Sequence, residues 1–374
     1  SETLPYDPRA LWTPSYGLTK FSDLFTNRQL VALTTFSDLV GEMHKRVLSD
    51  ALASGVDEGE SLEAGGTGAR AYADAIATYL ALGVSRLADY SNSLATWDAT
   101  RDSATHLFTR QAIPMNWSFI EVNPFSGSSG NFFSLLNGIC KVILRIPANT
   151  VGSVIQASAD ARDYSGLVVS TDPPYYDNIG YSDLSDFFYV WLRRSLSDIH
   201  PSLVSTMLTP KAEELVANPY RHNGKEQAAE FFVNGFNTVF ERIRQGANPD
   251  VPMTVYYAYK QQDNGKDGKT STGWHTLLDG LIGAGWEVTA TWPVRSELTN
   301  RMLSQGTNAL ASSIVLACRP RPGDAPTTTQ RVFVQRMKSE LPGALRTLMQ
   351  GDIAPVDLAQ AAIGPGIAVF SRYA

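Results

Sequence analysis

Hydrophobic residues in the N-terminal part of the chain recur every three or four positions, which is typical of amphipathic helices. This spacing predicts a long helix over residues 21–52, in which Thr26 and Gln29 are spaced as a capping box. A second helix is predicted over residues 71–90. Residues 55–70 are rich in Gly and Glu and predict an exposed loop between the two helices.

From about residue 140 the pattern changes to short apolar runs that are typical of β-strands. These runs are residues 153–157, 167–170, 253–259, 286–291 and 312–318. A helical pattern over residues 273–283 separates the third run from the fourth. Strands that alternate with helices indicate an α/β fold with a largely parallel sheet. No crossover helix is predicted between the last two runs, so we expect an antiparallel edge strand there.

The same pattern divides the chain into three regions. Residues 1–150 are expected to be a helical region, residues 151–325 an α/β core, and residues 326–374 a helical extension. Within the extension, Pro342 predicts a break in the helix, because proline removes a backbone hydrogen bond and its ring clashes with the preceding turn.

The composition indicates a globular protein and narrows its chemistry. Of the 374 residues, 43% are hydrophobic and 18% are charged, which suffices for a sizeable core. The formal net charge is −6, whereas proteins that coat nucleic acid are usually basic, so any contact with nucleic acid is expected to be local. The two cysteines, Cys140 and Cys318, exclude a disulfide framework and a four-cysteine zinc site. No apolar run is long enough to span a membrane, and we expect a cytoplasmic protein without membrane contact.

One segment carries recognisable chemistry: Asp172-Pro173-Pro174-Tyr175 directly follows an apolar run. Open α/β sheets bind ligands at the carboxyl ends of their strands, which is where this run would place the segment. The two prolines fix φ and remove two backbone donors, so the stiff loop offers acceptors. An acidic acceptor, a carbonyl acceptor and an aromatic ring can together hold a planar ring by its exocyclic amino group. The alternative is a proline-stiffened turn whose aspartate caps the following helix.

Asp172-Pro173-Pro174-Tyr175 resembles the catalytic motif of the DNA methyltransferases that modify exocyclic amino groups of adenine or cytosine. The resemblance implies that the Asp172 carboxylate and the Pro173 carbonyl accept hydrogen bonds from the target amino group. It also implies that Tyr175 stacks on a base flipped out of the duplex. S-adenosylmethionine (AdoMet) is then the cofactor and DNA the substrate.

More narrowly, residues 171–194 together with residues 25–30 resemble the large bacterial adenine-specific DNA methylases that contain a zinc-ribbon insertion. The resemblance covers most of residues 20–320 and implies a Rossmann-like methyltransferase sheet that acts on adenine N6. In that family, the glycine-rich AdoMet loop precedes the region found here, so we expect the remaining N-terminal part of a larger methylase chain as a partner. Three residues downstream of the motif are candidates for lining the base pocket: Tyr176, Asn178 and Tyr181.

A second segment, residues 123–131, resembles the AdoMet loop of such enzymes, although it begins with Asn where the family has Asp. In that interpretation Phe125, Gly127 and Gly130 are candidate cofactor-binding residues, because glycines allow backbone amides to approach a ligand. The alternative is an ordinary turn that enters a helix over residues 132–144.

Residues 153–163 resemble the strand and acidic residue that contact the AdoMet adenine, with Asp160 as the candidate. Cytosine N4 is the near rival to adenine N6 as the target. Enzymes that methylate a protein glutamine have Asn at the position of Asp172, so Asp favours a nucleobase. A folded, non-catalytic DNA-binding or scaffold fragment without a complete AdoMet site is an alternative of another class. The five histidines form no pair spaced four residues apart, so no metal site is expected.

Overall fold

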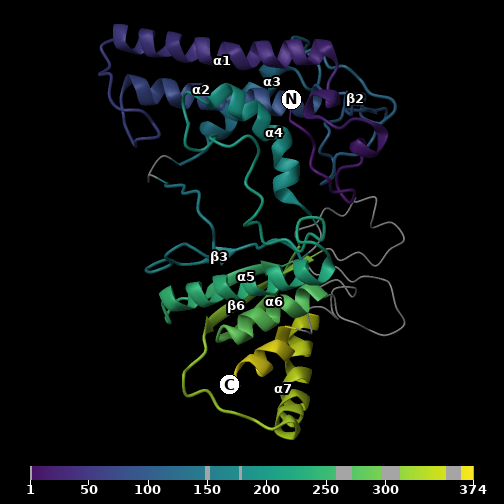
Figure 1. The fold of residues 1–374 in the computed structure, drawn as a ribbon. Helices are drawn as coiled ribbons and strands as arrows, with labels where there is room; N and C mark the ends of the chain where they lie inside the picture. The colour runs from purple at the N-terminus through teal and green to yellow at the C-terminus, as the bar shows by residue number, and fades with distance from the viewer. Residues whose placement is uncertain are drawn as a thin grey trace. The chain divides into compact units, whose positions relative to one another are not determined.

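The protein is described by a computed structural model, in which the chain divides into two compact units (Figure 1). The first unit comprises residues 1–156 and 179–214, and the second comprises residues 157–178 and 215–374. The residues that the structure describes are 2–147, 152–176, 179–257, 272–295, 312–350 and 364–373.

Helices α1 (Asn27–Ala53) and α2 (Ala69–Tyr90) pack along each other in the first unit (Figure 1). The predicted capping box is confirmed: Thr26 Oγ1 accepts the Gln29 N–H at 3.3 Å, and Gln29 Oε1 accepts the Thr26 N–H at 2.8 Å. These two bonds satisfy donors that the first turn of a helix otherwise leaves open. The predicted second helix and the loop before it are also confirmed.

The first unit contains two short 3-10 helices, a two-stranded antiparallel ribbon and two further helices. These elements are η1 (Thr13–Tyr16), η2 (Phe21–Leu24), β1 (Trp97–Asp98), β2 (Ser103–Ala104), α3 (Phe132–Ile143) and α4 (Tyr181–Leu196). Helix α4 buries Phe187 and Trp191, whose rings lie 5.6 Å and 5.3 Å from that of Phe25. The structure therefore groups residues 179–214 with the helical region, whereas the sequence pattern placed them in the α/β core.

The second unit is built on a mixed sheet with the strand order β3-β4-β6-β5. Its strands are β3 (Ser170–Thr171), β4 (Met253–Tyr257), β5 (Trp286–Arg295) and β6 (Ser312–Pro320). The α/β class is confirmed, but the largely parallel sheet is not: β3 is parallel to β4, whereas β6 is antiparallel to both β4 and β5. The reversed strand is internal and not at the predicted edge, because β6 pairs with β5 on one side and with β4 on the other.

Helices α5 (Lys225–Gly246) and α6 (Thr272–Gly283) lie side by side along this sheet (Figure 1). Alternate residues of β4 face them, so that Val255 packs with Phe232, Phe240 and Leu277 in one core. Helix α7 (Gln330–Gln350) continues through Pro342, so the predicted break is wrong; one missing backbone donor does not interrupt a helix of 21 residues. Residues 364–371 are again helical.

Two of the predicted strands differ from the structure. Residues 153–157 form no strand, and the run 167–170 yields only the two-residue β3, although the Val169 carbonyl also accepts the Thr254 N–H at 3.0 Å. Several apolar side chains in these runs are exposed, with Val154 at 99% and Val168 at 71%, whereas Val169 packs partly buried against the core. An apolar run becomes a strand only where a neighbouring strand and a core receive it, and no described strand pairs with residues 153–157.

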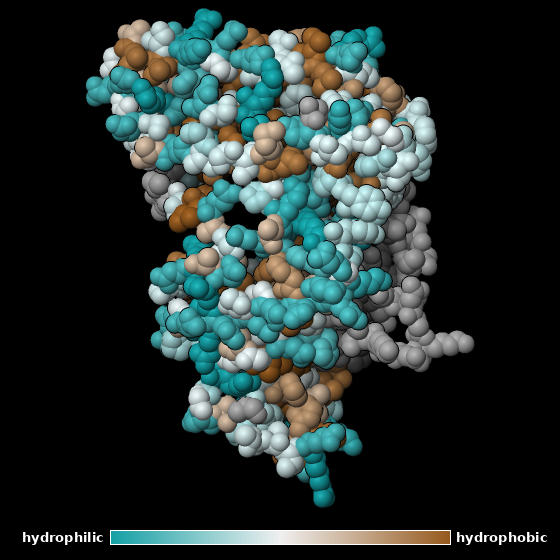
Figure 2. Space-filling model, in the orientation of Figure 1, coloured by the Kyte–Doolittle hydropathy of each residue, from teal (hydrophilic) through white to brown (hydrophobic). Residues whose placement is uncertain are grey.

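The surface of the protein, in the view of Figure 2, mixes hydrophobic and hydrophilic residues, without one continuous apolar area. No helix within the described ranges is long and apolar enough to span a membrane.

Candidate functional site

The Asp172 loop, residues Asp172–Tyr176, leaves the sheet at the carboxyl end of β3. Asp172 is exposed, whereas the four residues that follow it are half-buried. The Tyr175 hydroxyl donates to Asp172 Oδ1 at 3.1 Å and thereby orients the carboxylate. No described residue donates to Asp172 Oδ2, and an ionised carboxylate on this exposed residue can accept further hydrogen bonds.

Two tyrosines of this loop are packed against the core of the second unit. The Tyr175 ring meets the Tyr257 ring edge to face, with 5.1 Å between centroids and an interplanar angle of 77°. The Tyr176 ring meets Phe232 of α5 in the same way at 5.1 Å, and its carbonyl accepts the Ala217 N–H at 2.8 Å. Edge-to-face pairs favour a defined ring orientation, so the two contacts fix the end of the loop.

The edge of the sheet at which this loop lies also receives other elements. Strands β3, β4 and β5 run in one direction, so their carboxyl ends share this edge. Strand β4 ends there with Tyr257, and the first turn of α6 contributes Gly273 and Trp274. The edge at the carboxyl ends of parallel strands is the usual ligand site of open α/β sheets. Tyr257 and Gly273 were not predicted to be site residues, although Tyr257 lies within a predicted strand and Gly273 begins a predicted helix.

The three predicted pocket residues downstream of the motif have different positions. Tyr176 packs its ring into the core, as described above. Asn178 lies outside the described residues. Tyr181 begins α4 in the first unit, is 37% exposed, and its carbonyl accepts a hydrogen bond from Ser185 Oγ at 2.8 Å.

The Asn123 loop, residues Asn123–Asn131, belongs to the first unit and is an internally bonded turn. The amides of Phe125 and Ser126 donate to Asn123 Oδ1 and to the Asn123 carbonyl, at 3.0 Å and 3.1 Å. Asn131 is the N-cap of α3, and its Oδ1 accepts the Ser134 N–H at 2.9 Å. No strand is formed by residues 114–122, which precede the loop. Three amides of the loop are bonded within it, and no described strand leads into it, so the strand-then-glycine-turn arrangement that the resemblance implies is not formed here.

The three cofactor candidates in this loop differ in their surroundings. Phe125 is 71% exposed and touches Phe36, with the ring centroids 5.7 Å apart. Gly127 has open space where a Cβ would lie, so no close approach requires glycine there. Gly130 has φ of +77°, and a Cβ would lie 2.9 Å from Tyr90 Cδ1. Glycine is thus required at residue 130 by the turn into α3.

Asp160, the candidate contact to the AdoMet adenine, lies in a turn of the second unit. It accepts a hydrogen bond from Ser158 Oγ at 2.5 Å. The strand expected before it is absent, because residues 152–158 adopt no regular structure. The predicted element of a strand followed by an acidic residue is therefore wrong at this position.

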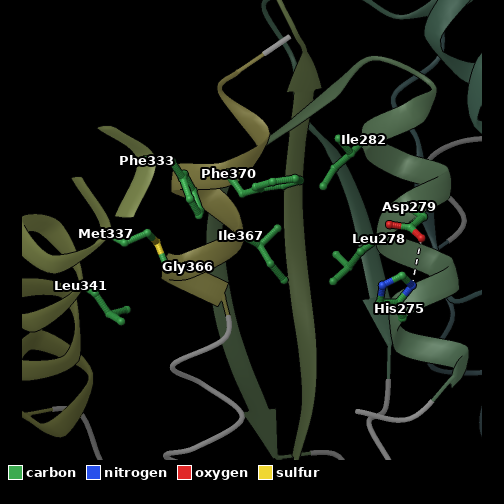
Figure 3. A pocket seen from close by; sticks show the side chains of 10 residues that line it. All are labelled: His275, Leu278, Asp279, Ile282, Phe333, Met337, Leu341, Gly366, Ile367 and Phe370. Atoms are coloured by element: carbon green, nitrogen blue, oxygen red, sulfur yellow. Dashed lines mark ion pairs between the residues drawn. The ribbon is translucent and has the colours of Figure 1, made fainter. Parts of the chain in front are cut away.

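A groove of about 530 Å³ lies elsewhere in the second unit, between α6, α7 and the helical residues 364–371 (Figure 3). Its lining is apolar apart from His275 and Asp279, which are exposed and whose Nδ1 and Oδ2 atoms lie 2.9 Å apart. None of the predicted site residues lines it. Within the described ranges, no cluster of His, Cys, Asp and Glu could hold a metal ion.

His222, in the turn before α5, stacks on Phe231 with the ring centroids 4.1 Å apart. Burial lowers the pKa of this histidine, and the charge of the neighbouring Arg221 lowers it further. The lowered pKa disfavours the charged form of this imidazole.

Comparisons with protein-family models, curated proteins and solved structures find no match to this chain. The function has to be argued from the site itself.

Proposed function

We propose that this chain holds the exocyclic amino group of a nucleobase in DNA, as the base-binding part of an amino-group methyltransferase that acts on adenine N6. One observation carries the proposal. The exposed Asp172 carboxylate stands at the carboxyl end of β3, oriented by the Tyr175 hydroxyl, and Tyr175 is in turn backed by Tyr257 at the end of the parallel neighbour β4.

The chemistry of this loop favours a ligand that donates hydrogen bonds. Asp172 is an acceptor when ionised, and Pro173 and Pro174 have backbone carbonyls but no N–H groups. An amino group has two N–H donors, and these can be shared between a carboxylate and a neighbouring carbonyl. The adjacent Tyr175 ring suits a planar partner, because stacking on an aromatic side chain contributes about 1–3 kcal/mol per base.

A base can reach such a loop only outside the duplex stack. Enzymes that modify a base therefore extrude it from the duplex or act on single-stranded DNA. In single-stranded DNA the base is already unpaired, so unstacking and unpairing it costs less free energy. In this proposal Asp172 and the Pro173 carbonyl orient the amino nitrogen, and Tyr175 holds the ring plane. AdoMet would supply the methyl group, but no described strand leads into the Asn123 loop, so no transfer step is assigned to that loop. Cytosine N4 offers the same donors, and adenine is preferred on the resemblance of residues 171–194.

The alternative of a DNA-binding chain that transfers no methyl group by itself is favoured by one observation. No described strand leads into the Asn123 loop, and three of its amides, those of Phe125, Ser126 and Ser128, are bonded within it. Both functions use the Asp172 loop in the same way, and they differ only in whether this chain incorporates radiolabel from AdoMet into DNA.

The proposal is tested by measuring the affinity of the full chain for two short single-stranded oligonucleotides by fluorescence anisotropy. One contains 2′-deoxyadenosine throughout, and the other contains 2′-deoxyribosylpurine, which lacks the 6-amino group. Hydrogen bonds to a charged group contribute about 1.5–3 kcal/mol, so we expect the adenine oligonucleotide to bind about 10- to 100-fold more tightly. Asp172→Ala should abolish this preference.

Asp163→Ala provides the matched control, because Asp163 is also exposed in the second unit and binds only locally, through the Ser165 N–H at 2.9 Å. This variant should keep the preference for adenine. Equal affinity of the wild-type chain for both oligonucleotides, or an unchanged preference in Asp172→Ala, would contradict the proposed function.

A further inference from the structure

Tyr257, the last described residue of β4, connects the Asp172 loop to α6. Its side chain is buried, with 3% of the residue exposed. Its ring meets Tyr175 at 5.1 Å on one side and Trp274 at 5.7 Å on the other, the second contact being tilted by 35°. Since Tyr175 donates to Asp172, the position of Tyr257 affects the carboxylate through one intermediate side chain.

Gly273, in the first turn of α6, lies directly against this arrangement. A Cβ at residue 273 would lie 2.8 Å from Tyr176 Cβ and 2.8 Å from the Tyr257 hydroxyl oxygen. In protein structures, Cβ atoms do not come this close to heavy atoms to which they are not bonded. The backbone at Gly273 is not in the left-handed region, so space and not conformation requires glycine here.

We infer that Gly273 and Tyr257 are positioning residues for the base-holding site: the bare first turn of α6 seats Tyr257 and Tyr176, and these two hold the Asp172 loop in register. The inference rests on the proposed function of Asp172. Neither residue touches the base in this account. They act through Tyr175 and through the backbone of Tyr176, which is contiguous with the motif.

A side chain at residue 273 would clash with two atoms that differ in how freely they can move. Tyr176 Cβ is fixed to the loop backbone and cannot rotate away, whereas the Tyr257 hydroxyl sits at the end of a buried ring. An alanine must therefore displace the loop, the ring or the helix. Hydrogen bonding to an amino group needs acceptors placed within about 0.5 Å, so such a displacement weakens amino-group recognition first.

Gly273→Ala and Gly283→Ala form a matched pair within α6, because nothing lies within 4 Å of a Cβ at residue 283. For Gly273→Ala in the full chain, we expect about a tenfold loss of affinity for the adenine oligonucleotide. Binding of the amino-lacking oligonucleotide should stay within about twofold, because stacking tolerates small shifts. Gly283→Ala should bind both oligonucleotides as the wild-type chain does.

A double variant tests whether the effect passes through Tyr257. Tyr257→Phe keeps the ring and removes the oxygen that the new Cβ would meet, so Gly273→Ala combined with Tyr257→Phe should recover at least about threefold in affinity. An amino-group preference equal in Gly273→Ala and Gly283→Ala would overturn the inference, as would equal losses on both oligonucleotides. If the wild-type chain shows no preference at all, the proposed function fails instead, and the two failures are thereby distinguished.

Discussion

The Asp172 loop and the Asn123 loop both begin with a polar residue followed by proline, but they are constructed differently. The Asp172 loop follows a strand of the mixed sheet, is held by side chains of other elements, and carries an exposed aspartate. No described strand leads into the Asn123 loop, and three of its amides are bonded to its own side chains and carbonyls before Asn131 caps α3. The first loop is supported from outside and is open to a ligand, and the second supports itself.

A ligand loop is therefore distinguished by the elements that hold it as well as by its residues. Donors that are bonded within a turn are less available to a ligand. A loop whose shape is fixed by neighbouring rings can keep an acceptor exposed, because the packing of these rings offsets the conformational entropy that the ordered loop loses. Changes that act on only one of the two loops test this difference.

The largest contrast is expected between the two thiols, one associated with each region. Cys318 of β6 is fully buried in the core of the sheet that carries the Asp172 loop, and burial raises its pKa to about 12. Cys140 is exposed on α3, the helix that the Asn123 loop enters. Because the thiolate is the reactive form, Cys318 should react with a disulfide reagent at least about a hundredfold more slowly than Cys140.

The reaction is followed at pH 8 under native conditions by the thiol that the reagent releases when it reacts with a cysteine. Cys140→Ser should remove the fast phase and leave the slow one. Two phases of equal rate would show that the core of this sheet is open to the reagent.

Loss of the Tyr175 ring should produce the next largest effect. Stacking contributes about 1–3 kcal/mol, so Tyr175→Ala should weaken binding of the adenine oligonucleotide by about 5- to 100-fold. Tyr175→Phe keeps the ring but loses the 3.1 Å hydrogen bond to Asp172, and we expect a loss of about threefold. Tyr72→Ala, which removes a tyrosine that is 58% exposed on α2, serves as the control and should bind normally. A phenylalanine variant as weak as the alanine variant would assign the main role to the hydroxyl.

The smallest effects are expected in the Asn123 loop. Gly130→Ala places a side chain at φ of +77° against Tyr90 and should lower the free energy of unfolding by about 1–3 kcal/mol. Gly127→Ala meets open space and should leave the melting temperature unchanged or slightly higher. Thermal unfolding followed by circular dichroism compares the two variants. Weaker AdoMet binding in Gly127→Ala at unchanged stability would restore the cofactor interpretation of this loop.

Much of the helical structure could be predicted from the sequence, because its signals are local. The Thr26 and Gln29 capping box and the apolar stripes of α1 and α2 act within a few turns. The prediction of a strand at residues 153–157 was wrong, because strand formation depends on a partner strand that the local pattern does not contain. The internal place of β6 likewise depends on which strand edges remain available.

The candidate site divides in the same way. Asp172 and Tyr175 could be identified because the motif is contiguous, and their hydrogen bond joins residues three positions apart. Tyr257 and Gly273 lie far along the chain from the motif and meet it only through the packing of β4 and α6. Contacts of this kind carry no signal in a single sequence.

Hydrogen–deuterium exchange of the full chain, with and without the adenine oligonucleotide, tests the central claim most directly. We predict slower exchange over Ser170–Tyr176 when the oligonucleotide is bound, less protection there with the amino-lacking oligonucleotide, and no change over the Asn123 loop. Protection of the Asn123 loop without protection of the Asp172 loop would contradict the account, and so would equal protection by the two oligonucleotides.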